Sequence, residues 1–295
     1  MDKDCHSLHL AFKSPQIRRL PTILALLFLV FASFCNELSL AWIHERVPRD
    51  ISPLPDLFFS FFPEIQGTII ITEYIMLLLV SSSLLVIFLH RNRWHVARRV
   101  FFCAGLSYIF RALCITLIQV PVPSQHTFCA PKGNTSLSLV IQRVAKMFWS
   151  AGIEQLRPRE LCGDLIVSGH TITIFTALLS FKQYCPRNLK PLGHLYTLLA
   201  IVALFAILLN RKHYSIDITL GYLVSSRIFM EYHSLALSYH DGSIHRNPLW
   251  SSIWAVVVPY LEKDAPPPHL FLNQLECPSQ CIQRLTNMCS SKTIS

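Results

Sequence analysis

Long apolar runs alternate with short polar segments along most of the chain. A helix needs about 20 mainly apolar residues to cross a hydrocarbon core about 30 Å thick. Suitable runs lie at 20–40, 67–89, 100–120, 171–184, 192–209 and 216–237, of which the fourth is the shortest. This pattern predicts an all-α membrane protein with six transmembrane helices. The predicted parts are an N-terminal segment (1–19), a six-span catalytic membrane domain (20–237) and a C-terminal tail (238–295).

Composition favours a membrane protein over the soluble classes. Of the 295 residues, 52% are hydrophobic and 15% are charged, whereas a soluble domain averages about 25% charged residues. Mean hydropathy is +0.41. These values argue against a soluble enzyme and against a nucleic-acid-binding protein. We therefore interpret the net charge of +9 as a mark of membrane topology.

Basic residues predict the orientation, because cytosolic loops carry an excess of Lys and Arg. The loops that follow the second and fourth runs are basic and lack acidic residues, and the N-terminal segment lies on the same side. The basic residues after the second run are Arg91, Arg93, Arg98 and Arg99, and those after the fourth run are Lys182, Arg187 and Lys190. Those of the N-terminal segment are Lys3, Lys13, Arg18 and Arg19. Both termini are therefore predicted to be cytosolic. The first run exceeds the apolar core of about 7–15 residues in a signal peptide, which favours a retained signal anchor over a cleaved peptide.

The loop between the third and fourth runs is then lumenal, and two of its features fit that side. Asn134 begins the only Asn-x-Ser/Thr sequon of the chain, a potential glycosylation site. Cys129 and Cys162 lie in the same loop, where either a disulfide or two free thiols fit the sequence. In the C-terminal tail, either S-palmitoylation or unmodified thiols fit Cys277, Cys281 and Cys289. The apolar stretch 251–261 is too short to span and fits the membrane interface.

Two polar clusters lie at the ends of predicted spans, where ionisable groups are functional candidates because lipid makes them costly. They are CGDLIVSGHT at 162–171 and HYSID at 213–217. The fourth and fifth spans form a hairpin with legs of about 24 and 28 Å at 1.5 Å per residue. His170 and His213 are therefore expected on the same membrane face, which the charge pattern makes lumenal.

The residue types in these clusters predict nucleophilic catalysis. His213 and Asp217 are four residues apart and share one face of a helix. The carboxylate can orient the imidazole, which leaves its other nitrogen as a nucleophile, while His170 supplies an acid for the leaving oxygen. Ser168, Gly169 and the following helix N-terminus offer hydrogen-bond donors to an anionic phosphate.

A metal centre is the competing interpretation of the same polar groups. Its ligands would be His170, His213, Asp217 and Asp164, but their spacing matches no metal-binding motif. We therefore predict no metal and no other cofactor.

Both clusters resemble the sphingomyelin synthase family, within the lipid phosphate phosphatase-like superfamily. Family members carry CGDxxxSGHT, matched at 162–171, and HY[ST]xD[VI], matched at 213–218. Two outer motifs also match. They are Pro53-Leu54-Pro55-Asp56, and Arg98-Arg99 followed by Arg111 and the turn at 120–123. The correspondence runs from about residue 50 to about residue 240 and follows the family's order and six-span topology.

This resemblance implies transfer of phosphocholine from phosphatidylcholine to the primary hydroxyl of ceramide, which yields sphingomyelin and diacylglycerol. It assigns His213 as the nucleophile that forms a phosphohistidine, Asp217 as its orienting group and His170 as the acid and base. The implied partners are these four membrane lipids, with homo-oligomerisation left open. The implied location is the Golgi or plasma membrane, with a lumenal or extracellular active site.

The chain departs from related motifs, so the motifs do not identify the residues that bind the phosphate. Related lipid phosphatases carry a Lys and an Arg at positions where this chain has Ser150 and Ile207, which counts against a phosphatase. The candidates for substrate or phosphate binding are Ser168, Gly169, Asp164, Arg111, Arg227 and Asp56. For the two arginines, snorkelling to the membrane interface is the alternative.

The residue before the nucleophile affects the predicted head group. It is acidic in vertebrate family members but is Lys212 here, which puts choline in doubt. Cation–π contacts from Tyr214, Phe58 or Phe59 still suit a quaternary ammonium. The alternatives are transfer of phosphoethanolamine or another head group to ceramide, a phosphodiesterase or phosphatase that uses water, and a non-enzymatic membrane protein.

Overall fold

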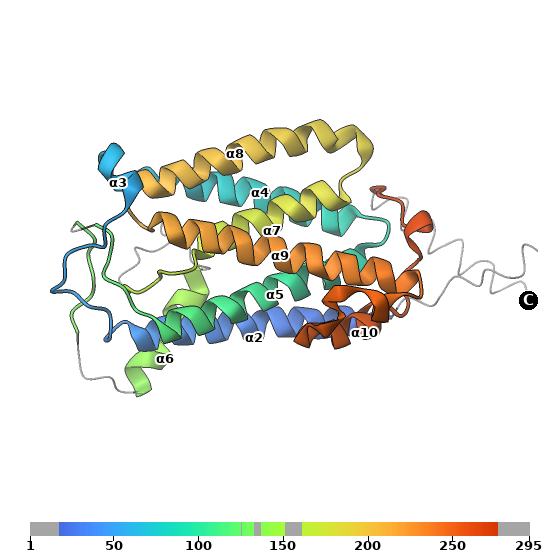
Figure 1. Ribbon diagram of the computed structural model, residues 1–295, viewed down its shortest axis with the longest axis horizontal. Coiled ribbons are helices and arrows are strands. Elements are labelled where there is room, and N and C mark those ends of the chain that lie inside the picture. Colours follow the sequence, from blue (N-terminus) through green and yellow to red (C-terminus); the bar gives the residue numbers. More distant parts are fainter. Residues whose placement is uncertain (1–17, 125, 133–136, 151–160, 277–295) are drawn as a thin grey trace, which may run out of the picture.

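The computed structural model describes residues 18–124, 126–132, 137–150 and 161–276, and its architecture is helical (Figure 1). Asn134 and the three cysteines of the predicted tail lie outside these residues. The long helices are α2 (Leu20–Ile43), α4 (Ile69–Leu89), α5 (Arg93–Leu117), α7 (Gly169–Tyr184), α8 (Lys190–Leu209) and α9 (Ser215–His240). The shorter ones are α3 (Leu57–Phe61), α6 (Leu137–Ser150) and α10 (Val258–Glu262), with 3₁₀ turns at Arg187–Leu189, Ile244–Arg246, Pro248–Ser251, Ile253–Val257 and Pro268–Leu270.

Four of the predicted spans are helices long and apolar enough to cross a membrane. These are α2, α4, α5 and the helical stretch Arg187–Leu209 that contains α8. The predicted fourth and sixth spans are also helical, as α7 and α9, but α7 has only 16 residues and α9 is more polar. Both contact α5 and each other inside the bundle, where Thr176 and Ser225 are buried. Protein neighbours therefore cover polar groups that lipid would not tolerate.

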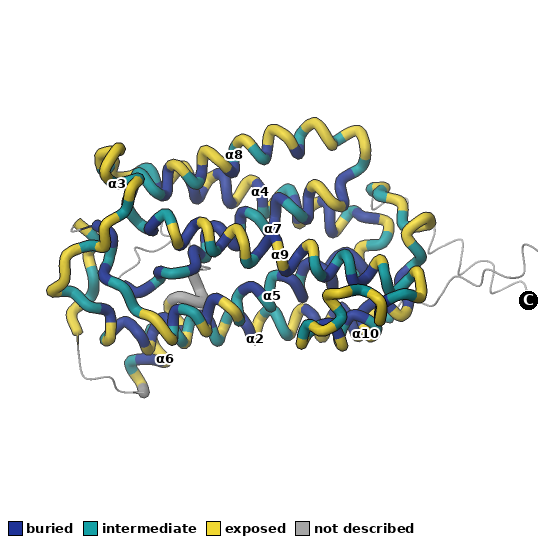
Figure 2. The backbone as a smooth tube through the Cα atoms, viewed as in Figure 1, coloured by how far each residue is buried: buried dark blue, intermediate teal, exposed yellow. Residues whose placement is uncertain are grey.

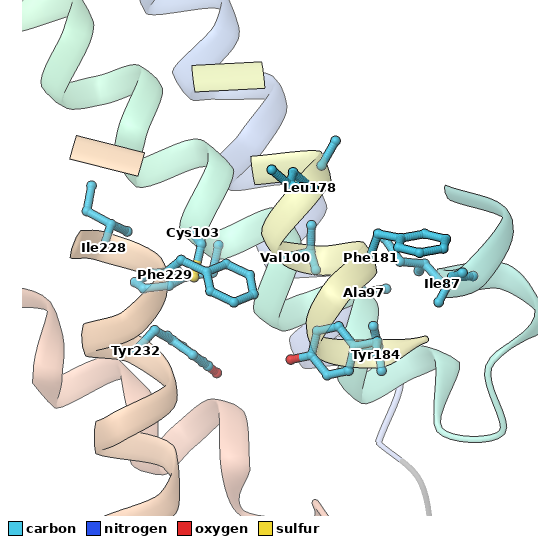
Figure 3. Close-up of a cluster of buried hydrophobic side chains, with 14 of the residues drawn as sticks. Ile87, Ala97, Val100, Cys103, Leu178, Phe181, Tyr184, Ile228, Phe229 and Tyr232 are labelled. Carbon is cyan, nitrogen blue, oxygen red and sulfur yellow. The ribbon is translucent and has the colours of Figure 1, made fainter. Parts of the chain in front are cut away.

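Apolar side chains cover both the interior and the outer surface of the bundle. Figure 3 shows Val100 and Cys103 of α5, Phe181 of α7 and Phe229 of α9 within one buried cluster. The outward faces of α2 and α8 are largely exposed in Figure 2 and carry large apolar residues such as Phe31 and Leu198. So much exposed apolar surface is unusual for a soluble monomer but suits contact with lipid.

Helix α5 begins at Arg93, ahead of the predicted start at residue 100. Its early start is stabilised by buried ion pairs. Arg98 Nη1 lies 2.9 Å from Asp264 Oδ1, and Arg99 Nη2 lies 2.6 Å from Glu262 Oε2. Each charge is compensated by a hydrogen-bonded partner of opposite sign, which allows it to be buried. These two arginines, taken from the sequence as loop charges, thus belong to the interior.

The residues after α9 pack against the bundle, whereas the sequence predicts a separate tail that begins at residue 238. Helix α10 contacts α2, α5 and α9, and Ala255 and Val258 are completely buried. The apolar stretch 251–261 therefore contributes to the protein core, while its Ile253 and Val256 are exposed, and its place at the membrane interface stays a prediction. We refer to residues 244–276 as the C-terminal segment.

Helix α6 was not predicted from the sequence and lies in the loop between α5 and α7. Val140 and Val144 pack against Ala41 of α2. Arg143 Nη1 lies 2.8 Å from Glu45 Oε1 at the same contact. The basic charge of Arg143 in this loop is thus paired within the protein.

The two ends of the bundle differ in what they carry. In Figure 1, α7 and α9 both begin at the end that also holds α3 and α6, while α10 lies at the other end. The hairpin of α7 and α8 returns the chain to the starting end of α7, as the similar lengths of the legs predict. The first end is therefore where the two sequence clusters meet.

Candidate active site

Two imidazole rings meet where α7 and α9 begin. His170 is the second residue of α7, and His213 lies two residues before α9. Their ring centroids are 6.0 Å apart and the ring planes are inclined by 68°. Only 7% of His170 and 2% of His213 is exposed. Two buried, adjacent imidazoles are groups that can act as a nucleophile and an acid–base pair in one site.

Asp217 orients His213. Its Oδ2 lies 3.4 Å from His213 Nδ1 and accepts a hydrogen bond of 2.9 Å from the Tyr214 N–H. Its Oδ1 accepts a second bond of 2.9 Å from the Ile166 N–H. Because Nδ1 of His213 faces this fixed carboxylate, Nε2 points away from it and is the nitrogen available for attack.

A strained backbone connects the two clusters. Ile166 has a φ of +74°, a conformation that β-branched residues rarely adopt. In this conformation its N–H reaches Asp217, and the Ser168 N–H donates to the Asp217 carbonyl oxygen at 3.0 Å. The strain at Ile166 is therefore associated with bringing the start of α7, and so His170, beside His213.

The polar groups at the start of α7 were candidates for phosphate binding. The Ser168 hydroxyl accepts a hydrogen bond of 3.3 Å from the Thr171 N–H and caps the helix. Ser168 is also fully buried, so its structural use is helix capping. The N–H groups at Gly169 and His170 open the helix, and such groups are suited to hold an anion.

Arg111 is buried inside the bundle next to Gly169. It forms an ion pair with Asp164 and donates one hydrogen bond to Asn36 Oδ1 and another, of 2.9 Å, to the Val167 carbonyl oxygen. A Cβ atom at Gly169 would lie 3.2 Å from the guanidinium carbon. The sequence analysis did not predict that Asn36 would accept a hydrogen bond from Arg111. The polar side chain of Asn36 within the first apolar run could have indicated such a contact.

Asp56 and Tyr214 join the outer motifs to the histidine loop. Asp56 accepts hydrogen bonds from the Ser215 N–H at 2.7 Å and the Ser215 hydroxyl at 2.9 Å. The Tyr214 hydroxyl donates to the Pro121 carbonyl oxygen and accepts from the Leu54 N–H, both at 3.0 Å. Burial raises the pKa of Tyr214, so the hydroxyl keeps its proton for this bond. Asp56 thus has a positioning role that the sequence did not reveal.

A pocket of about 50 Å³ opens beside the two histidines. Lys212, Asp164 and Pro123 contribute to its wall together with His170 and His213. Lys212 is therefore placed next to whatever group enters the site, as its position before His213 suggests. The Arg111 ion pair compensates the charge of Asp164, whereas Lys212 brings a positive charge to the rim.

Arg227 lies away from this site. Arg227 is exposed on α9, twelve residues after Ser215 or about 18 Å along the helix. Within the described ranges, no group of three or more His, Cys, Asp or Glu side chains is arranged to hold a metal ion.

A disulfide ties the first cluster to the preceding loop. Cys129 and Cys162 are bonded, with their Cα atoms 5.6 Å apart. The Cys162 N–H also donates to His44 Nδ1 at 2.9 Å. The chain then turns through Gly163, whose φ of +113° favours glycine. These contacts fix the start of the 162–171 motif against the end of α2.

Comparisons with known proteins agree with the motifs and the geometry. The profile described as "PAP2 superfamily C-terminal" matches residues 161–234, which include all three residues of the histidine–aspartate arrangement. "Sphingomyelin synthase-related 2" of Caenorhabditis elegans is 63% identical over 254 residues, which cover 86% of this chain and 78% of that protein. The chain belongs to the sphingomyelin synthase family.

More distant members of the family are named for a reaction. "Phosphatidylcholine:ceramide cholinephosphotransferase 1" of C. elegans is 33% identical over 267 residues, or 88% of this chain and 55% of that protein. The human protein of the same name is 31% identical over 217 residues, or 73% of this chain and 52% of its own length. The chain therefore spans about half the length of these two cholinephosphotransferases.

Proposed function

We propose that the protein transfers phosphocholine from phosphatidylcholine to the primary hydroxyl of ceramide and releases diacylglycerol. The observation that carries this proposal is the pair of buried imidazoles, one of them oriented by Asp217. The names of the cholinephosphotransferase relatives support the choice of lipids.

The first step forms a covalent intermediate. His213 Nε2 attacks the phosphorus of phosphatidylcholine, so that an N–P bond forms while the bond from phosphorus to the diacylglycerol oxygen breaks. His170 donates a proton to that oxygen as it leaves. Asp217 stabilises the positive charge that develops on His213, because its carboxylate faces Nδ1.

The second step transfers the head group. His170, now neutral, takes the proton from the primary hydroxyl of ceramide, whose oxygen attacks phosphorus and displaces His213. One phosphodiester is replaced by another, and both histidines return to their starting protonation states. Burial of the two rings keeps competing water away from the intermediate, which favours transfer over hydrolysis.

The proposal includes the membrane arrangement. All six long helices cross the bilayer, both termini are cytosolic, and the histidines face the lumen of the Golgi or the exterior of the plasma membrane. The exposed apolar faces of α2, α4 and α8 support contact with lipid. Glycosylation of Asn134, read as a mobility shift reversed by a glycosidase, tests the side of the catalytic end, and immunofluorescence tests the organelle.

Lys212 favours a second candidate, a head group other than choline. This residue lines the pocket of the two histidines, and a positive charge there opposes a cationic head group. The same covalent mechanism would then run with a different donor lipid.

A head-group transfer assay in liposomes tests both candidates. Purified protein receives fluorescent ceramide and either phosphatidylcholine, phosphatidylethanolamine or phosphatidylinositol as the only donor. We expect labelled sphingomyelin from the choline donor, and a loss of at least about a hundredfold in His213→Ala and in His170→Ala.

Other outcomes separate the alternatives. Product from a different donor would retain the mechanism and change the head group. Release of free phosphorylcholine without ceramide would indicate a hydrolase. Full activity of a folded His213→Ala protein would refute the covalent mechanism. The matched control is His194→Ala, which changes a histidine near the start of α8, at the end of the bundle away from His213.

A further inference from the structure

A cavity of about 520 Å³ lies between α2, α4, α5 and α7. Much of its wall is apolar and includes Val30, Val80, Leu84, Val100 and Phe101. On α7, the lining residues lie between Ile172 and Ala177, and the first of them is two residues after His170. The cavity thus extends along the helix that carries one catalytic histidine and has the character of a site for a hydrocarbon chain.

The cavity wall also includes the carboxylate of Glu37. A ligand that consists only of a hydrocarbon chain would offer this carboxylate no hydrogen-bond donor. Glu37 lies on α2, within one of the most apolar helices of the protein. Its Oε1 accepts a hydrogen bond of 3.1 Å from Asn36 Nδ2. Its Oε2 is buried and has no hydrogen-bond partner among the described residues. A buried, unsatisfied carboxylate oxygen is costly and indicates that a donor binds there.

A chain of polar contacts connects Glu37 with the active site. Asp164 pairs with Arg111, Arg111 donates to Asn36, and Asn36 donates to Glu37. Arg111 also packs against Gly169, next to His170. The carboxylate is therefore held at the part of the cavity that adjoins the catalytic cluster.

A second polar pair lies on the same side of the cavity. Thr173, which lines the cavity, donates to the Gly169 carbonyl oxygen at 3.0 Å. Its hydroxyl oxygen lies 2.7 Å from the Tyr108 hydroxyl. Thr173 is three residues from His170, or about 4.5 Å along α7. A lipid whose chain fills the cavity would thus place its polar end within reach of the catalytic histidines.

We propose that this cavity is the acceptor site and that Glu37 accepts a hydrogen bond from the amide N–H or secondary hydroxyl of ceramide. The inference rests on the proposed function and adds a basis for acceptor choice. Diacylglycerol offers a single hydroxyl, which is the reacting group, and has no other donor for Glu37. A site built around a hydrogen bond discriminates against a ligand that lacks the donor. Glu37 is therefore a specificity-determining residue for ceramide over diacylglycerol.

Acceptor competition tests this role. The protein is supplied with phosphatidylcholine and either labelled ceramide or labelled diacylglycerol, so that the products are labelled sphingomyelin or labelled phosphatidylcholine. We expect Glu37→Gln to lower the ceramide-to-diacylglycerol ratio of kcat/KM about tenfold or more, mainly through KM for ceramide. Glu276→Gln, which makes the same exchange at a partly exposed ion pair outside the cavity, is the control and should keep the ratio.

The wild-type protein provides a test that needs no variant. An N-methyl-3-deoxyceramide keeps the reacting primary hydroxyl but lacks both proposed donors to Glu37. We expect its KM to exceed that of ceramide about tenfold or more. An unchanged KM for this analogue, or an unchanged selectivity ratio in Glu37→Gln, would overturn the inference.

Photolabelling keeps this inference separate from the proposed function. A photoactivatable ceramide should label the wild type, His213→Ala and Glu276→Gln, and should label Glu37→Gln much less. Diacylglycerol should compete for labelling more weakly than ceramide. If the wild type transfers no head group, the proposed function fails, but this labelling pattern still tests Glu37. Equal labelling of all four folded proteins would refute its role in binding.

Discussion

At the scale of single residues, one buried hydroxyl connects three motifs that are far apart in the sequence. The Tyr214 hydroxyl bonds the backbone at Leu54 and at Pro121, and the residue follows His213 directly. The outer motifs around 53–56 and 120–123 thus contact the histidine loop directly.

Replacing Tyr214 with Phe should therefore reduce activity without changing substrate choice. The change leaves one N–H and one carbonyl without their partner, which costs about 1–3 kcal/mol. We expect a lower kcat, a nearly unchanged KM and a lower Tm. Tyr222→Phe changes an exposed tyrosine on α9, the helix that follows Tyr214, and is the control. A kcat equal to that of the wild type would contradict a positioning role.

At the scale of elements, α5 and α9 are joined to the C-terminal segment by buried charges. Glu262 accepts hydrogen bonds from Arg99 and from the Tyr232 hydroxyl, the latter at 2.7 Å. His95 and Arg98 face Asp264 in the same region. The two arginines and the C-terminal segment therefore stabilise each other. Without either partner, the other would hold unpaired buried charge.

Replacing Glu262 with Gln should be strongly destabilising. Breaking one side of a buried ion pair costs about 3–5 kcal/mol, because the remaining charge is left uncompensated. Glu276→Gln changes the same residue type at the same end of the molecule, in a partly exposed pair with Arg91, and should cost less than about 1 kcal/mol. Thermal unfolding in detergent measures both. Equal stability of the two variants would show that the buried pair contributes little.

These carboxylates also make stability depend on pH. Burial alone would raise the pKa of Glu262, but Arg99 and the bonds from His240 and Tyr232 lower it below its usual value. Burial is likewise outweighed at Asp264 by bonds from Arg98 and the Arg18 backbone, so that its pKa is also lowered.

A carboxylate whose pKa is lower in the folded state than in the unfolded state contributes its full stability at pH values above the unfolded-state pKa of about 4. This contribution is lost as the pH falls through the folded-state pKa. We expect the difference in unfolding free energy between wild type and Glu262→Gln to be constant above about pH 5 and to shrink below about pH 4. A pH series of thermal unfolding checks this. A difference that grows on acidification would contradict the assignment.

At the scale of the whole molecule, the catalytic end is organised by contacts between loops, and the opposite end by the C-terminal segment. The Cys129–Cys162 disulfide closes a loop of 33 residues in sequence separation at the catalytic end. It joins the loop after α5 directly to the motif that contains Asp164 and His170. Stability and active-site geometry are therefore linked at this end.

Loss of the disulfide should lower both stability and activity. Removing a disulfide that closes such a loop typically costs about 2–4 kcal/mol. We expect a lower Tm and lower transfer activity for the Cys129→Ser, Cys162→Ser double variant. A reducing agent should lower the Tm of the wild type but not that of the double variant. A Cys103→Ser variant, which changes a free buried cysteine, is the control for the reducing agent.

The sequence by itself determined the helical class, the long apolar helices and the two clusters that hold His170, His213 and Asp217. Long apolar runs and a spacing of four residues are local properties, and the similar legs of a helical hairpin carry the two histidines to one end. The tertiary structure decided what depends on contacts between distant segments. Such contacts include the pairing of Arg98 and Arg99 with the C-terminal segment and the bonds that Asp56 and Tyr214 form with the loops.

Contacts between distant segments also explain why Glu37 lines a cavity and Arg227 does not. In the sequence, both are charged residues within predicted spans, and only Arg227 was a candidate for phosphate binding. In the folded chain, Glu37 faces a cavity beside α7, whereas Arg227 is exposed on α9. The face of a helix that a charge occupies, and the helices packed against that face, determine whether the charge can act in a site. That arrangement exists only once the helices have packed.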